Sequence, residues 1–112
     1  MIEPTHNPLV ARLRQQCDGP RDGALLRFSL GNALLNDGDT GAAVDELRRA
    51  VDFDPAYSAA WKLLGKACLA HGDPAAAAEA WRRGIAAASQ RGDKQAEKEM
   101  SVFLRRLEKP QS

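Results

Sequence analysis

A self-match at a spacing of 34 residues constrains this chain more than any other feature. The stretch 58–91 contains two runs of small and apolar residues at three- and four-residue spacing, the pattern of α-helices with one buried face. Gly72, Asp73 and Pro74 separate the runs: Gly ends a helix, Asp caps the next, and Pro is favoured in a first helical turn. Shifted back by 34 residues, the stretch matches itself, which predicts stacked helical hairpins. The residues Leu30, Gly31, Ala33, Leu35, Gly38, Asp39, Ala42, Ala43, Arg48 and Arg49 coincide with Leu64, Gly65, Ala67, Leu69, Gly72, Asp73, Ala76, Ala77, Arg82 and Arg83.

The motif inside each copy is similar to a known signature. The second copy reads Trp61-x2-Leu64-Gly65-x2-Cys68 and then Ala77-x3-Trp81, which resembles the tetratricopeptide repeat (TPR). The first copy has Arg27, Leu30, Gly31, Leu34, Ala43, Leu47, Ala50 and Pro55 at the matching positions. The departures from the family pattern are Arg27 for Trp, Leu34 and Cys68 for Tyr, Gly84 for Ala, and Ser89 for the closing Pro. The resemblance covers residues 24–91 and implies an all-α fold, a right-handed superhelix of about six antiparallel helices.

The repeat register divides the chain into four segments. The predicted segments are 1–23, a tail and a capping half repeat; 24–57 and 58–91, the two TPR repeats; and 92–112, a capping helix and tail. Helices are expected at about 24–36, 40–53, 56–70 and 74–89, with a short helix starting at Asn7-Pro8 and a last helix after Gly92-Asp93. Residues 1–6 are expected to be frayed.

The last helix is predicted to cap the stack. It carries one apolar stripe in charged surroundings, as a solenoid requires at its end, and the stripe fits the first-helix pattern with one residue inserted. The stripe consists of Ala96, Met100, Phe103, Leu104 and Leu107. Gly31 and Gly65 lie inside predicted helices, where Gly is less favourable than Ala. The repeat tolerates them because the returning helices need a close approach at their small residues Ala43, Ala50, Ala77 and Gly84.

Composition and charge exclude several classes of protein. Lys plus Arg (16) and Asp plus Glu (15) nearly cancel, so no long-range field attracts nucleic acid or an anionic membrane. No stretch has the length and apolarity of a membrane span, and the first residues do not resemble a signal peptide. Cys17 and Cys68 suggest neither a disulfide framework nor a zinc site, and Cys68 is predicted to be a buried free thiol. We therefore expect a cytoplasmic protein.

The sequence contains no catalytic constellation. His6 and His71 are isolated, with no nucleophile or orienting carboxylate at a spacing that general acid–base chemistry needs. The turn 38–41 is too short for a phosphate-binding loop and lacks Lys. The chain is predicted not to be an enzyme and to need no cofactor or metal.

The first helix of each hairpin carries a stripe of residues next to its core positions, and this stripe is the candidate binding site. Its members share a face by their spacing and are not needed for the core: Leu25, Phe28, Asn32 and Asn36 in one copy, and Ala59, Lys62, Lys66 and Ala70 in the next. The resemblance implies that this face lines a concave groove for an extended or helical peptide, with Asn32, Lys62 and Lys66 as polar contacts. The alternatives are that Lys62 and Lys66 are solvated or pair with Glu97, and that Leu25 and Phe28 contact the N-terminal helix.

A basic stripe lies on the returning helices. Arg14, Arg48 and Arg82 share one repeat position, and Arg49 and Arg83 follow two of them. A polyanion is one partner for such a ridge. The alternative is local pairing, since Asp45 precedes Arg49 by four, Glu79 precedes Arg83 by four, and Asp52 follows Arg48 by four. We predict a solvated face and no nucleic-acid partner.

These observations predict a non-enzymatic protein–protein interaction module that binds a peptide or helix of a partner on the concave face. The alternative is a self-associating structural unit that uses its end helices, and the burial of Phe103, Leu104 and Leu107 discriminates between the two. A monomer is the expected state, with a homodimer as the other possibility.

Overall fold

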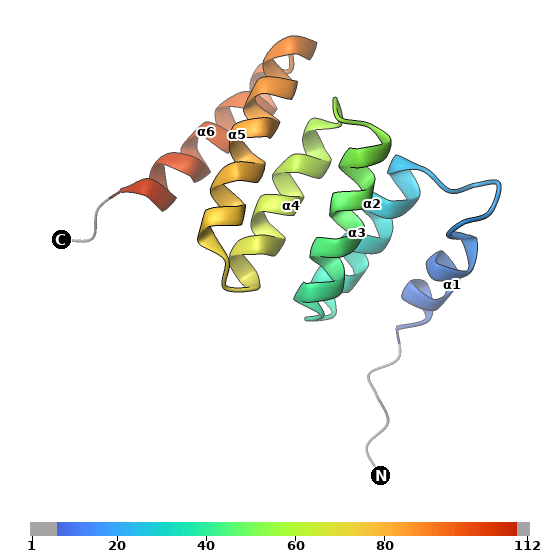
Figure 1. The fold of residues 1–112 in the computed structure, drawn as a ribbon. Coiled ribbons are helices and arrows are strands. Elements are labelled where there is room, and N and C mark those ends of the chain that lie inside the picture. Colours follow the sequence, from blue (N-terminus) through green and yellow to red (C-terminus); the bar gives the residue numbers. More distant parts are fainter. Residues whose placement is uncertain (1–6, 110–112) are drawn as a thin grey trace.

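A computed structural model describes residues 7–109 of the chain, so the predictions for residues 1–6 and 110–112 lie outside the described part. This part consists of six α-helices in the order α1 (Pro8–Gln16), α2 (Ala24–Asn36), α3 (Thr40–Phe53), α4 (Ser58–Ala70), α5 (Pro74–Arg91) and α6 (Lys94–Glu108). Figure 1 shows them stacked in chain order, with α1 at one end and α6 at the other. The tightest packing is within the hairpins α2–α3 and α4–α5, and α6 packs on α5. The predicted all-α stack is confirmed.

The short turns between helices follow the predicted chemistry. The backbone of Gly38 and of Gly72 is left-handed (φ 85° and 83°), a conformation that glycine adopts without a steric penalty at a helix end. Asp39 and Asp73 then cap α3 and α5, and their carboxylates accept the amide N–H groups three residues later at 3.3 and 3.1 Å. Asp93 caps α6 in the same way at 3.1 Å.

The prediction that α4 begins near Ala56 is wrong by two residues. The Asp54 carboxylate accepts the Ala56 N–H at 3.0 Å, and the Trp61 indole donates to the Pro55 carbonyl at 2.8 Å. These bonds hold residues 54–57 as a turn, and α4 starts at Ser58 with Tyr57 as its N-cap residue.

The core lies between the two layers of helices. Its largest fully buried side chains are Leu30, Leu47, Leu64, Met100 and Cys68. Cys68 is a buried free cysteine, as predicted, and burial raises the pKa of its thiol. The helices approach closely where large side chains lie over glycines: a Cβ added at Gly31 would lie 2.5 Å from Leu47 Cγ, and one added at Gly65 would lie 2.5 Å from Trp81 Cδ1.

The last helix takes the place of a first helix in the stack. Leu30, Leu64 and Met100 are the equivalent buried residues of α2, α4 and α6. Met100 follows Leu64 by 36 positions, whereas Leu64 follows Leu30 by 34, so the insertion is two residues and the predicted single residue is wrong. Phe103, Leu104 and Leu107 pack against the core but remain half-buried. None of the helices in this part of the chain has both the length and the apolarity needed to span a bilayer.

Candidate binding surface

The surface formed by α2, α4 and α6, called here the first-helix face, contains the predicted site. α4 contacts both α2 and α6, so the three helices are neighbours. On α2, Leu25 is 69% exposed, and Asn32 and Asn36 are exposed. Phe28 is half-buried because its ring packs on Tyr57, with 5.1 Å between ring centroids. One contact partner of Phe28 is therefore Tyr57, the N-cap residue of α4.

The two lysines of α4 face α6. Lys62 Nζ lies 2.8 Å from Glu99 Oε1, so the sequence-based alternative that it pairs with Glu97 is wrong. The hydrogen bond from Lys62, helped by one from Gln95, holds the pKa of Glu99 below its ordinary value. Lys66 lies over the ring of Phe103, 5.1 Å from its centroid, and its side chain is exposed. Lys66 therefore remains accessible, whereas Lys62 is engaged by α6.

An open pocket lies between α4 and α6 beside Lys66, and is called here the α4–α6 pocket. It measures about 320 Å³ and is lined by Leu69, Trp81, Phe103, Arg106 and Leu107. The Trp81 ring packs against that of Phe103 at a tilt of 46°, with 5.4 Å between the ring centroids, and its indole N–H donates to the Lys62 carbonyl at 3.1 Å. These two contacts hold the Trp81 ring in place in the pocket wall. Sequence reasoning missed this pocket because it assigned the apolar side chains of α6 to capping or to self-association, and not to a pocket shared with α4. The available sequence signal was Leu69, which repeats Leu35 at the 34-residue spacing and is 44% exposed in the structure.

A buried ion cluster joins the turn before α2 to α3. Arg27 is buried, and its guanidinium donates to Asp22 at 2.7 and 2.9 Å and to Glu46 at 2.7 Å. Asp18, at 3.4 Å, is a more distant partner. The hydrogen bonds from Arg27, with others from the Asp18 and Gly23 amides, hold the pKa of the Asp22 carboxyl well below its usual range. Every charge of the cluster has a partner, so its arrangement indicates a structural role.

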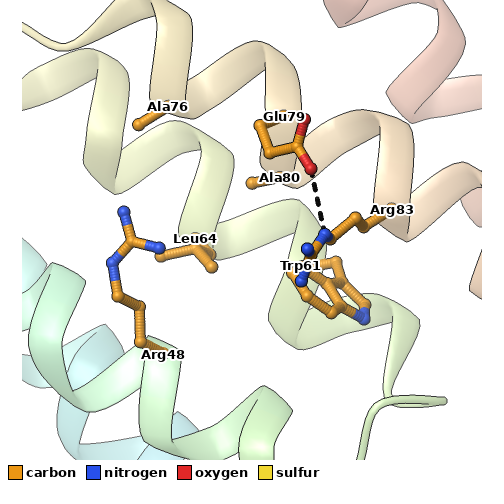
Figure 2. A pocket seen from close by; sticks show the side chains of 7 residues that line it. All are labelled: Arg48, Trp61, Leu64, Ala76, Glu79, Ala80 and Arg83. Carbon is orange, nitrogen blue, oxygen red and sulfur yellow. Dashed lines mark hydrogen bonds and ion pairs between the residues drawn. The ribbon is translucent and has the colours of Figure 1, made fainter.

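A second pocket lies on the side of the returning helices (Figure 2). It measures about 220 Å³, and Trp61 and Leu64 form its floor between Arg48 of α3 and Arg83 of α5. The Arg83 guanidinium lies 5.8 Å from the centroid of the Trp61 ring and pairs with Glu79 at 3.0 Å.

Of the three local pairs predicted for the basic stripe, Glu79–Arg83 is therefore confirmed. The Asp45–Arg49 and Arg48–Asp52 pairs, whose residues all lie in the described part, do not form in the structure. Arg82 pairs with Glu108 of α6, a contact that the sequence pattern did not indicate.

The titratable residues do not gather into a recognisable metal site. Within residues 7–109, no three His, Cys, Asp or Glu side chains come close enough together to hold a metal ion. His71 shares a hydrogen bond of 2.8 Å with the Thr40 hydroxyl, at the contact between the α4 end and the α3 start. His6 lies outside the described residues.

Comparison with known proteins identifies the fold family. A family model described as "Tetratricopeptide repeat" matches residues 24–67. A TPR repeat-containing protein of Pseudomonas aeruginosa is 58% identical over 88 residues, which cover 79% of this chain and 84% of that protein. The chain belongs to the tetratricopeptide repeat family. TPR repeats generally mediate protein–protein interaction, and proteins of this family are generally non-catalytic scaffolds.

Two solved structures are similar to the TPR chain over most of its length. The solution structure of a Bordetella parapertussis protein is 47% identical with a TM-score of 0.76, covering 91% of this chain and 89% of that one. The crystal structure of MamA is 20% identical with a TM-score of 0.66, covering 88% of this chain and 64% of that one. The likeness to MamA concerns the fold alone.

Proposed function

We propose that this TPR protein is a non-enzymatic interaction module that holds a peptide or helix of a partner protein on its first-helix face. The division into repeats at 24–57 and 58–91 is part of this proposal, because it makes α2 and α4 the first helices of the two repeats. In the TPR family the corresponding face is concave, and repeat curvature creates an extended surface of this kind.

The observation that supports the proposal best is the α4–α6 pocket with its cationic rim. Leu69, Phe103 and Leu107 leave room of about 320 Å³ for an apolar side chain. Lys66 lies beside the pocket and Arg106 lines it, and neither forms an ion pair within residues 7–109. A partner segment with a large apolar side chain and nearby carboxylates has matching chemistry.

The exposed residues of α2 extend the same surface. Asn32 and Asn36 offer amide groups to the backbone of an extended segment, and Leu25 offers apolar area. The role of Lys62 differs from that of Lys66, because a partner has to compete with Glu99 for its ammonium group. Phe28 contributes through the exposed part of a ring that is fixed against Tyr57.

The test starts by capturing a partner with the intact chain and mapping the binding region of that partner to a peptide. A surface of this size predicts a dissociation constant in the micromolar range. Lys66→Glu and Arg106→Glu should each weaken peptide binding about tenfold, measured by calorimetry. Arg49→Glu makes the same charge change on an exposed position of α3 and should leave the affinity unchanged. Binding that is insensitive to both substitutions on the first-helix face would contradict the proposal.

A further inference from the structure

The two ends of the described chain have the form of complementary halves of one hairpin. α1 packs on α2 in the way that α3 packs on α4, as a returning helix against the next first helix. Asn7, the N-cap residue of α1, lines a pocket with Asp37 and Asp39 of the turn between α2 and α3. Thr40 and His71, which stand at closely equivalent places in the next unit, are hydrogen-bonded. α1 therefore occupies the place of a returning helix.

Within residues 7–109, α1 has no first helix with which to form a hairpin, and α6 has no returning helix. α1 has nine residues, none of them buried, and Leu9 is 44% exposed. α6 packs on α5 through Ala96 and Met100, while Glu97, Ser101 and Leu104 on its other side are only half-buried. In α2 and α4, the equivalent side contacts the returning helix of the same hairpin.

The charges at these two uncovered sides are complementary. In the first hairpin, Arg27 of α2 pairs with Glu46 of α3. Glu97 of α6 is at the position of Arg27, and Arg12 of α1 is at the position of Glu46. The two ends therefore also carry opposite charges, but here the acidic residue is on the first helix and the basic residue on the returning helix. Neither Glu97 nor Arg12 forms an ion pair in the part of the chain that the structure describes.

The sizes of the side chains are complementary as well. Gly31 of α2 lies against Leu47, and Gly65 of α4 lies against Trp81, so a small residue on the first helix meets a large residue on the returning helix. At the same two positions α6 has Ser101 and α1 has Leu13, again small against large. Leu104 of α6 and the exposed Leu9 of α1 stand at the positions of Leu34 and Ala43, which are both buried in the first hairpin. Both ends therefore carry the residue types of one complete hairpin.

We propose that α1 of a second copy docks on the uncovered side of α6 and completes a hairpin across two chains. This contact joins unlike surfaces, so each copy presents one free α6 and one free α1, and the assembly grows as an open chain. Because α1 is short and isolated helices of this length are marginal, docking should also stabilise α1. The interface is small, and we expect a dissociation constant of about 0.1–1 mM.

The experiment measures the mass of the intact chain by sedimentation across a concentration series reaching a few millimolar. The wild-type chain should pass from monomer to dimer and to larger species without stopping at the dimer. A concentration-independent monomer would overturn the proposal. Assembly that ends at a dimer would also overturn it, because a closed dimer requires a symmetric contact.

Charge reversal identifies the junction. Arg12→Glu and Glu97→Arg should each weaken association about tenfold, because each places like charges opposite one another. The double variant restores an opposite pair and should recover most of the wild-type association. Arg49→Glu, a charge reversal away from both ends, is the matched control and should have no effect. Single variants that associate like the wild type, or a double variant as weak as the singles, would refute this junction.

A steric variant tests the size complementarity separately. Ser101→Trp fills the side of α6 on which Leu13 of the second copy is placed, and should abolish association while the thermal unfolding of the monomer stays close to that of the wild type. Mixed with the wild type, it should terminate growing chains and lower their mean mass. Unchanged association of Ser101→Trp would contradict the proposal.

Discussion

Arg27 provides the sharpest prediction about stability. Its guanidinium makes two bonds to Asp22, at 2.7 and 2.9 Å, and one to Glu46 at 2.7 Å. Arg27→Ala leaves the Glu46 side chain, 13% exposed, without its counter-charge. Removing one partner of a buried ion pair costs about 3 kcal/mol of unfolding free energy. With a urea m-value of about 1.5 kcal/mol/M, the unfolding midpoint should fall by about 2 M.

The second repeat suggests a matched replacement. The positions of Arg27 and Glu46 are occupied there by Trp61 and Ala80, both buried. Arg27→Trp combined with Glu46→Ala and Asp22→Asn removes the buried charges and places an apolar pair where the fold accepts one; Asp22 is included because its side chain is 9% exposed and bonded twice to Arg27. Because apolar residues often replace a buried ion pair without loss, this triple variant should lie closer to the wild type than Arg27→Ala does at neutral pH. A midpoint shift below about 0.5 M for Arg27→Ala would refute the reasoning.

The pH dependence of the same comparison checks its cause. Arg27 lowers the pKa of Asp22 in the folded state. The stability that the Arg27–Asp22 pair contributes is therefore complete above the unfolded pKa of Asp22, about 3.9, and is lost as pH falls through the folded pKa. The stability difference between the wild type and Arg27→Ala should be largest near neutral pH and should shrink on acidification below about pH 4. Urea unfolding followed by circular dichroism at several pH values measures this difference, and a gap that widens in acid would contradict the assignment.

Two further substitutions test the packing and capping. Gly65→Ala should lower stability by about 1–3 kcal/mol despite the better helix propensity of Ala, because its Cβ would lie 2.5 Å from Trp81 Cδ1. Gly41→Ala, also inside a helix, is the control, because its Cβ would meet only the exposed His71 side chain. A Gly65→Ala chain that unfolds at the wild-type temperature would show that the contact is soft. Asp93→Ala removes both the α6 cap and the bond from the Ser58 hydroxyl at 3.0 Å. Its melting temperature should fall at neutral pH, and the deficit should fade in acid because these bonds hold the pKa of Asp93 below its ordinary value; a deficit independent of pH would contradict this.

The sequence predicted the stack because its signals are local. Gly38, Gly72, Asp39 and Asp73 mark the turns by their own conformational and hydrogen-bonding preferences, and the helix bounds of α2 and α3 follow. The start of α4 was missed because side-chain hydrogen bonds to the backbone of the 54–57 turn decide it: the Trp61 indole donates to the Pro55 carbonyl, and Arg91 of α5 donates to the Ala56 carbonyl.

The binding surface was predicted less completely, because it depends on the register of α6. A one-residue error rotates a helix by about 100°. The stripe pattern implied one inserted residue where the structure has two, and Lys62 pairs with Glu99 and not with Glu97. Arg27 shows the other limit. The departure of Arg27 from the family pattern was visible in the sequence. Its burial could not be predicted, because it depends on charged partners from a turn and from another helix, Asp22 and Glu46. The joint change from Trp61 and Ala80 to Arg27 and Glu46 between the repeats was the signal that pointed to a contact.

The claim that partners bind on the first-helix face is tested most directly by the two tryptophan indoles. Trp81 lines the α4–α6 pocket, whereas Trp61 lines the pocket on the side of the returning helices, so each reports on one surface. A two-dimensional ¹H–¹⁵N spectrum of the intact chain, titrated with the mapped partner peptide, should show the Trp81 indole resonance shifting while that of Trp61 stays in place. A shift of Trp61 with an unchanged Trp81 would place the partner on the opposite surface and contradict the account.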